Sequence, residues 1–300
     1  MEGNINQRKK RKAGNILKFL VKLLISLTAL YFVIQKVDPG QIANLYRQSE
    51  IFLFLPAIVF FVLSKMISAY RLNQLFQRAG VHLSEAVNLK LYWMGMYYNI
   101  FLPGGVGGDA YKIYLLKKHL FQRTRKLFSA ILVDRANGLF VLLLMSSVLF
   151  AFVLDNIWFS VSLILLVPLS YLVYMAIMQK WFSDFRAFMH KINVYSLLVQ
   201  FAQLLMVIFL LLSWDISNNY LIYLSVFLIS SAIAILPVSI GGAGARELTF
   251  LCFSKYLPFD LNTAIALSLM FYLITLLVSF GGIIYTIRPI RFNERQLNHS

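Results

Sequence analysis

The stretch FLPGGVGGDAYK, residues 101–112, decides how this chain is organised. It places four glycines, a proline, an aspartate and a lysine between two runs that look membrane-embedded. Irregular backbone is tolerated at membrane depth only where protein or a water-filled cavity satisfies its polar groups. The stretch therefore predicts that the chain encloses a polar cavity within a membrane.

The composition favours a membrane protein. Of the 300 residues, 60% are hydrophobic and 13% are charged, whereas soluble domains carry about 25% charged residues. A soluble helical bundle would show polar faces at helical spacing, which the longest apolar runs lack. We therefore expect an all-α polytopic membrane protein. Runs of spanning length lie at 16–36, 51–70, 127–154, 157–178, 195–214 and 261–287.

Two further apolar segments, 86–118 and 221–257, are broken in the middle by proline and glycine. Lys and Arg concentrate in alternate loops, and such charge stays on the cytoplasmic side. The two sides alternate correctly only if each broken segment is a re-entrant hairpin. The second arm of the first, about 10 residues, would reach the middle of a roughly 30 Å hydrocarbon core. The alternative is that each broken segment makes two complete spans.

The hairpins give both halves of the chain the same order of two spans, a hairpin and a span. Three crossings per half invert the second half, as in the inverted repeats of many transporters. We expect both termini to lie in the cytoplasm of a bacterial or archaeal cell. The expected parts are a basic N-terminus, 1–15, a single transmembrane domain, 16–288, with repeats 16–154 and 157–287, and a tail, 289–300.

The first glycine-rich tip has the chemistry of an anion site. Pro103 ends the first arm, since it cannot continue a helical ladder, and the glycines permit positive φ. Asp109 is expected to cap the N-terminus of the second arm. That N-terminus would bring partial positive charge and free N–H groups to the cavity. The alternative is that the glycines only let two segments pack tightly.

Charged residues within a membrane are costly and usually functional. The candidates at the tips are Asp109, Lys112, Arg246 and Glu247. Asp134 and Arg135 lie inside a long span, and we expect the pair Arg135–Asp109 or the pair Asp134–Lys112. The alternative is that these charges form salt bridges that only hold the bundle together. Lys65 is expected to snorkel or to cap the end of a span.

Several other functions are not supported by the sequence. The run GGVGGDAYK lacks the spacing of a phosphate-binding loop or a dinucleotide fingerprint. The chain shows no pattern of a catalytic triad or a metalloprotease, and its single cysteine, Cys252, excludes an internal disulfide and a thiolate zinc site. The basic residues follow membrane topology, so we expect no nucleic-acid partner, no catalytic residue, no metal and no cofactor.

Four motifs resemble those of the flippase-like transmembrane domain of lysylphosphatidylglycerol synthases. They are YYNIFLPGGVGGDAYKIYLL, the arginine of ISAYRLNQLF, VDRANGLF and LPVSIGGAGARELTF. The resemblance covers residues 16 to 288 and implies a lipid translocator. The substrate-binding residues it implies, together with the charged candidates, are Arg71, Asn99, Pro103, Gly104, Gly105, Gly107, Gly108, Asp109, Lys112, Asp134, Arg135, Ser239, Gly241, Gly242, Gly244, Arg246 and Glu247.

We therefore expect a flippase that moves an anionic phospholipid, a glycolipid or a polyprenyl-phosphate-linked lipid across the inner membrane. Because no aminoacyl-transferase domain follows in these 300 residues, we expect no lysyl transfer. One alternative is a membrane glycosyl or acyl transferase that uses a lipid-linked donor. Another is a non-transporting partner of a separate lipid-modifying or glycosyl transferase.

Overall fold

The computed structural model describes residues 24, 27, 28, 30–101, 107–120, 124–235, 242–288, 290 and 292, and their regular elements are helices. Five helical segments are long and apolar enough to cross a membrane: Ile51–Arg78, Thr124–Ala151, Ile157–Trp181, Ser183–Ser213 and Leu261–Ile287. Five of the expected spans are thus confirmed, and the prediction of a polytopic helical membrane protein holds. The first expected span, 16–36, lies mostly outside the described residues.

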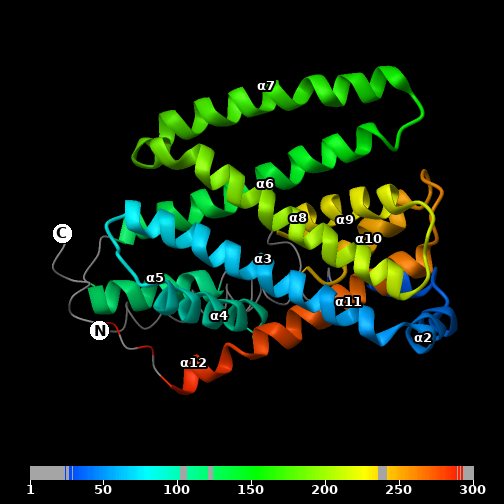
Figure 1. Ribbon diagram of the computed structural model, residues 1–300, viewed down its shortest axis with the longest axis horizontal. Coiled ribbons are helices and arrows are strands. Elements are labelled where there is room, and N and C mark those ends of the chain that lie inside the picture. Colours follow the sequence, from blue (N-terminus) through cyan, green and yellow to red (C-terminus); the bar gives the residue numbers. More distant parts are fainter. Residues whose placement is uncertain are drawn as a thin grey trace, which may run out of the picture.

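The spanning helices form a bundle whose helices mostly follow its long axis (Figure 1). Helix α3, Ile51–Arg78, packs closely against α8, Met189–Ser213. Helix α6, Thr124–Ala151, packs against α7 and against α9, Tyr220–Ile235. Helix α7, Ile157–Trp181, lies at one side of the bundle and leaves large apolar side chains exposed, as at Leu165 and Leu172. Such a face suits lipid tails, because a membrane helix needs apolar side chains wherever it meets hydrocarbon.

Local sequence signals set several helix ends. Asn156 caps α7 by accepting hydrogen bonds from Trp158 N and Phe159 N, and the Asp260 carboxylate accepts one from Thr263 N over 2.7 Å at the start of α11. Side-chain oxygens at this position satisfy N–H groups that have no partner within the helix. The other elements outside the two broken segments are α2, Pro39–Gln48, the 3₁₀ helix η1, Ser183–Phe188, α11, Leu261–Phe280, and α12, Ile283–Ile287.

Each broken segment is a pair of short helices that pack against each other. The first pair is α4, Glu85–Phe101, with α5, Gly107–Leu120, and the second is α9, Tyr220–Ile235, with α10, Ala245–Phe253. These helices have 17, 14, 16 and 9 residues, fewer than the about 20 needed to span a bilayer. Helix lengths therefore favour hairpins over complete double spans.

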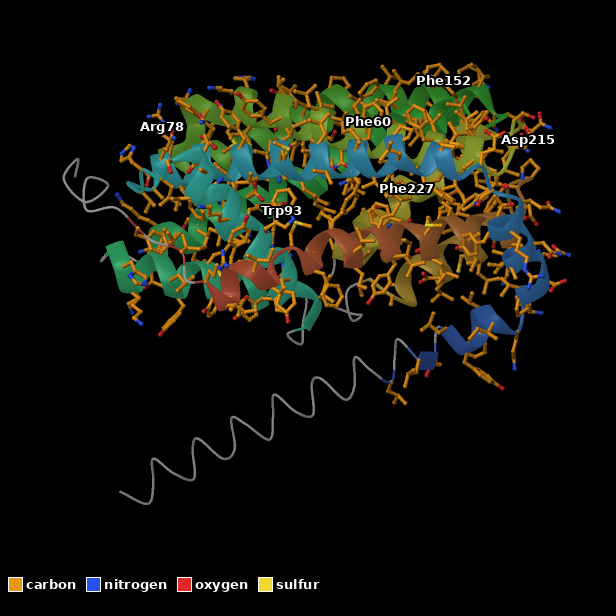
Figure 2. All side chains as sticks on the ribbon, turned by 60° about the horizontal axis from the view of Figure 1, so that its bottom comes forward. Phe60, Arg78, Trp93, Phe152, Asp215 and Phe227 are labelled. Carbon is orange, nitrogen blue, oxygen red and sulfur yellow. The ribbon has the colours of Figure 1, made fainter. Side chains whose placement is uncertain are left out.

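The two hairpins enter the bundle from opposite ends. Figure 2 shows Arg78, at the end of α3, near one end of the molecule, and Asp215, which follows α8, at the other. The chain enters α4 shortly after Arg78 and enters α9 shortly after Asp215. Opposite entry is what an inverted repeat requires, while the repeat symmetry itself stays a prediction.

A polar layer separates two apolar cores. On α3, Ala57 and Phe61 belong to one core and Leu72, Leu75 and Phe76 to the other. The residues between them on the inner face are polar, and the same change occurs halfway along α6 and α8. The members of this layer include Ser64, Lys65, Ser68 and Arg71 on α3, Asp134 and Arg135 on α6, and Ser196, Gln200 and Gln203 on α8.

Candidate functional site: a cationic cavity inside the bundle

A cavity of about 300 Å³ occupies the polar layer. Its walls come from α3, α6, α8, α9, α11 and the start of α10, so the second hairpin contributes directly to it. Lys65, which lines the cavity, is residue 15 of the 28 in α3, about 21 Å along the helix at 1.5 Å per residue. The cavity therefore lies near the middle of a spanning helix.

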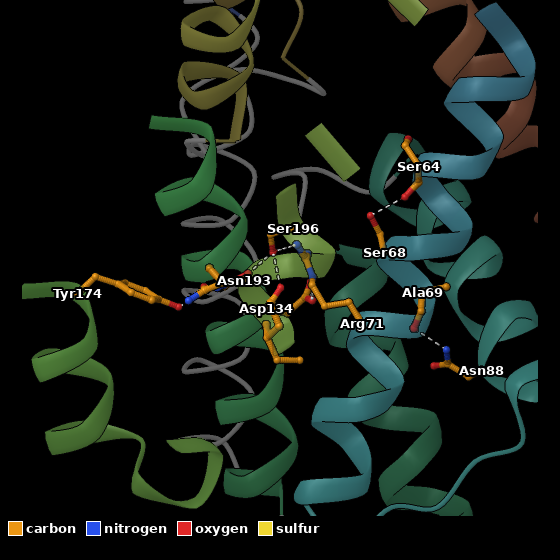
Figure 3. Close-up of polar contacts among 11 residues, drawn as sticks. Ser64, Ser68, Ala69, Arg71, Asn88, Asp134, Tyr174, Asn193 and Ser196 are labelled. Carbon is orange, nitrogen blue, oxygen red and sulfur yellow. Dashed lines mark hydrogen bonds and ion pairs between the residues drawn. The ribbon is translucent and has the colours of Figure 1, made fainter. Parts of the chain in front are cut away.

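Arg71 is fixed by contacts with two other helices (Figure 3). Its Nε donates to Asp134 Oδ1 over 2.8 Å, and its Nη1 donates to Ser196 Oγ over 2.6 Å. The Ser196 hydroxyl donates in turn to the Asn137 side chain, whose Nδ2 donates to the Tyr174 hydroxyl over 2.8 Å. Charge-assisted bonds of this kind are strong, so Arg71 is held in place and largely neutralised.

Asp109 pairs with two cations near the start of α5. Lys112 Nζ lies 3.0 Å from Asp109 Oδ1, and Arg135 Nε donates to Asp109 Oδ2 over 2.6 Å. The expected pair Arg135–Asp109 is thus confirmed. The expected pair Asp134–Lys112 is wrong, because Arg71 from α3 reaches Asp134 and Lys112 bonds the carboxylate one turn before it.

The first hairpin also corrects two expectations about its tip. Asp109 is not the N-cap, since α5 begins at Gly107 and places Asp109 in its first turn. The cap-like bond comes from Asn99 on α4, whose Oδ1 accepts from Gly108 N over 2.8 Å. A Cβ on Gly108 would lie 1.9 Å from Gly95 O. Gly108 is therefore required for close contact between α4 and α5 and not for positive φ.

Positive φ occurs at the second tip, where Gly242 has a φ of 85° and Gly244 a φ of 83°. Gly244 is the N-cap of α10, and its N–H donates to Glu247 Oε2 over 2.7 Å. The other oxygen, Oε1, accepts from the Ser268 hydroxyl over 2.7 Å. Glu247 is thus buried, caps α10 and holds it against α11. It also lines the cavity.

Aromatic rings hold the guanidinium of Arg246, and no carboxylate of the described residues forms an ion pair with it. Its Cζ lies 4.1 Å from the centroid of the Phe271 ring and 5.4 Å from that of Phe227. Its Nη1 is buried and has no hydrogen-bond partner among the described residues. The faces of aromatic rings attract cations without removing their charge. Arg246 therefore offers a free donor and a full positive charge to the cavity.

Lys65 is a second cavity cation. It lies over the Phe61 ring, with 4.6 Å from Nζ to the centroid. Within the part of the chain that the structure describes, the ion pairs use Arg71, Lys112 and Arg135, and none uses Lys65 or Arg246. The expectation that Lys65 snorkels or caps a span is wrong, since α3 continues to Arg78. Its signal in the sequence was a lysine inside a long apolar run.

Apart from Gly244, the N-cap of α10, the predicted site residues divide into three sets. Arg71, Asp134, Arg135, Gly242, Arg246 and Glu247 line the cavity together. Asn99, Gly107, Gly108, Asp109 and Lys112 form the neighbouring junction of α4 and α5, which Arg135 links to the cavity. Pro103, Gly104, Gly105, Ser239 and Gly241 lie outside the described residues.

The comparison with protein families agrees with this architecture. A model of the lysylphosphatidylglycerol synthase transmembrane region matches residues 19–282. The chain belongs to this family. The match includes all five spans, up to Gly282, and both broken segments. No curated protein sequence matches the chain.

The cavity has the means to bind an anion. Arg71 and Arg135 are paired with carboxylates, whereas Lys65 and Arg246 carry charge that the described side chains do not balance by ion pairing. An isolated charge is expensive to bury away from water, so a bound anion would relieve that cost at both residues. The site can thus hold a phosphate-like group at membrane depth.

Proposed function

We propose that this protein binds the head group of an anionic membrane lipid in the central cavity and moves the lipid between leaflets. The observation that carries the proposal is the pair Lys65 and Arg246, two cavity cations that lack carboxylate partners among the described residues. The guanidinium of Arg246 matches phosphate oxygens in a bidentate arrangement. The start of α10 adds the partial positive charge of a helix N-terminus.

Family membership supports a lipid as the substrate. The family is named for the membrane region of an enzyme that makes a modified phospholipid. A cavity of about 300 Å³ lies at the small end of ligand sites, which measure roughly 300–1,000 Å³. It suits a head group, and the acyl chains would remain in the bilayer beside the bundle.

The two hairpins give the proposal a route to transport. They enter from opposite ends, and the second forms part of the cavity. In many transporters, broken helices near the midplane hold the substrate while one repeat moves against the other. The proposed role is transport and not catalysis, and a separate lipid-modifying or glycosyl transferase would supply the lipid. Under this proposal both termini face the cytoplasm.

Reconstitution into liposomes tests the proposal. Phosphatidylglycerol with a fluorescent acyl chain is placed in both leaflets, and a membrane-impermeant reductant then bleaches every label that reaches the outer leaflet. The wild-type protein should allow nearly complete bleaching, while the double variant Lys65→Met and Arg246→Gln should resemble empty liposomes. The control Leu165→Ala, on the exposed side of α7, should match the wild type. Equal bleaching by the double variant and the wild type would contradict the proposal.

A further inference from the structure

The cavity contains unused hydrogen-bonding groups beside its cations. Within the described residues, the buried polar atoms without a partner include Gln200 Oε1, Ser231 Oγ and Arg246 Nη1, and all three residues line this one cavity. Buried polar groups are normally bonded, and leaving one unpaired is costly. A ligand that supplies the missing partners would recover this cost.

These neutral groups, which we call the neutral wall, come from other helices than the cations. Gln200 and Gln203 are three residues apart on α8 and therefore share one face of that helix, and Ser231 projects from α9. Lys65 is on α3 and Arg246 is on α10. A side-chain amide both donates and accepts, as does a hydroxyl. This wall is therefore complementary to neutral hydroxyl groups, which also donate and accept.

The cavity offers little to a cationic head group. A carboxylate balances an ammonium group best, and each of the two carboxylates in the described lining already accepts a hydrogen bond. Asp134 accepts from Arg71, and both oxygens of Glu247 are occupied by Gly244 N and the Ser268 hydroxyl. An added ammonium would also lie close to Lys65 and Arg246. Like charges brought together in a buried site are strongly unfavourable.

We propose that the site selects a phosphodiester head group that carries neutral hydroxyls, such as a glycerol or a sugar, and rejects head groups that carry an ammonium. The phosphate would lie between Lys65 and Arg246, and the hydroxyls would bond Gln200, Gln203 and Ser231. This inference rests on the proposed function and adds the chemical class of the head group. It also excludes a lysylated lipid as the preferred substrate of this chain.

Binding competition on the purified full chain in phosphatidylcholine nanodiscs tests the inference. The probe is fluorescent phosphatidylglycerol, and the competitors are phosphatidylglycerol, phosphatidic acid, phosphatidylserine and lysylphosphatidylglycerol. Phosphatidylglycerol should compete best, phosphatidic acid less well because its head group lacks the alcohol hydroxyls of glycerol, and the two ammonium lipids worst. Soluble glycerol phosphate forms a further arm. Competition by it as strong as by the lipid would assign the site to a free solute and overturn the inference.

Matched variants test the role of the neutral wall. Ser231→Ala and Gln200→Leu should each reduce the preference for phosphatidylglycerol over phosphatidic acid by about three- to tenfold, the loss expected for one hydrogen bond. Binding of phosphatidic acid itself should stay within twofold. The control is Ser146→Ala, since Ser146 also has a buried hydroxyl without a partner but lies outside the cavity lining. It should leave the preference unchanged.

The outcomes separate this inference from the proposed function. If phosphatidylglycerol, phosphatidic acid and phosphatidylserine compete equally well, and all compete better than phosphatidylcholine, the site recognises negative charge alone. Only the head-group inference then fails. If lysylphosphatidylglycerol competes as well as phosphatidylglycerol, the exclusion of ammonium groups is wrong. If no anionic lipid competes better than phosphatidylcholine, the proposed function fails with it.

Discussion

A substitution at Lys65 can distinguish a role in lipid binding from a role in stabilising the fold. It lies at mid-helix in α3, lines the cavity and forms no ion pair among the described residues. A structural cation in a membrane bundle is usually paired, as Arg71 is with Asp134. An unbalanced buried cation instead lowers the stability of the lipid-free protein. Its removal should therefore weaken lipid binding without lowering stability.

Lys65→Met should therefore raise the melting temperature of the lipid-free protein or leave it unchanged, while it weakens binding of phosphatidylglycerol. Methionine keeps much of the length of the side chain and removes the charge. One charged hydrogen bond contributes about 1.5–3 kcal/mol, so affinity should fall by about ten- to a hundredfold. Thermal unfolding and lipid titration on the same sample measure both effects. A lower melting temperature with unchanged affinity would show that Lys65 is structural.

Arg246 should show a graded response to substitution. Arg246→Lys keeps the charge but loses the planar fork of donors, and Arg246→Gln loses both. We expect affinity for anionic lipid to decrease in the order wild type, Arg246→Lys, Arg246→Gln, with about a tenfold loss at the last step. Lipid titration in nanodiscs measures this order. Full affinity in Arg246→Gln would remove Arg246 from the site.

Glu247→Gln provides the neighbouring control. Its carboxylate caps α10 and bonds Ser268, so the substitution should lower the free energy of unfolding by about 1–2 kcal/mol. It should leave the order of lipid preferences unchanged. The two adjacent residues would then separate into one that binds and one that holds the helix.

At the scale of elements, the first hairpin depends on a close contact between two helices. Gly108 on α5 meets the backbone of Gly95 on α4, and the side chain of Lys112 passes over Gly95 on its way to Asp109. The sequence correctly predicted that each of these two segments is broken into two helices, because proline and glycine are local signals. It could not assign the role of each glycine, since that role depends on which helix lies opposite.

Gly108→Ala should consequently destabilise the α4–α5 hairpin, although alanine favours helix over glycine by about 1 kcal/mol. A Cβ at Gly108 would overlap Gly95 O, and backbone atoms cannot move aside cheaply. The matched control is Gly138→Ala on α6, where the nearest atoms lie at 3.7 Å, an ordinary contact. We expect a clearly lower melting temperature for Gly108→Ala and an equal or higher one for Gly138→Ala. Equal behaviour of the two variants would contradict the packing argument.

The ion pairs show the same division between what sequence can and cannot predict. The pair Arg135–Asp109 followed from counting charged residues within the membrane, and it is present. The partner of Asp134 could not be found in this way. Arg71 lies 63 residues away in the sequence, and the apolar run predicted at 51–70 ends just before it. Likewise, the unpaired state of Lys65 becomes visible only when the neighbouring helices are in place.

At the scale of the whole molecule, the bundle places one polar layer between two apolar cores and exposes apolar side chains outside. This distribution reverses what a soluble protein shows, and it agrees with a cavity enclosed at membrane depth. The hairpins enter from opposite ends of the bundle. The account therefore requires that the Arg78 end and the Asp215 end lie on opposite sides of the membrane.

Cysteine labelling in intact cells tests this topology. In a Cys252→Ser background, cysteines at Ser217 and Tyr256 should react with an impermeant maleimide from outside. Those at Lys126 and Arg186 should react only after the membrane is opened. All four positions are exposed in the structure, so burial cannot explain a difference between them. Reaction of Lys126 and Ser217 from the same side would refute the arrangement of the two hairpins.

Photo-crosslinking from inside the cavity tests the central claim most directly. Benzoylphenylalanine replaces Tyr272, which lines the cavity, or Leu165, which faces outward on α7, in membranes of phosphatidylcholine with one-tenth phosphatidylglycerol. Position 272 should capture phosphatidylglycerol well above its share of the membrane, and Lys65→Met with Arg246→Gln should abolish that enrichment. Position 165 should capture both lipids in proportion to their abundance. Capture at position 272 in proportion to abundance, or no capture there, would contradict an anionic head-group site.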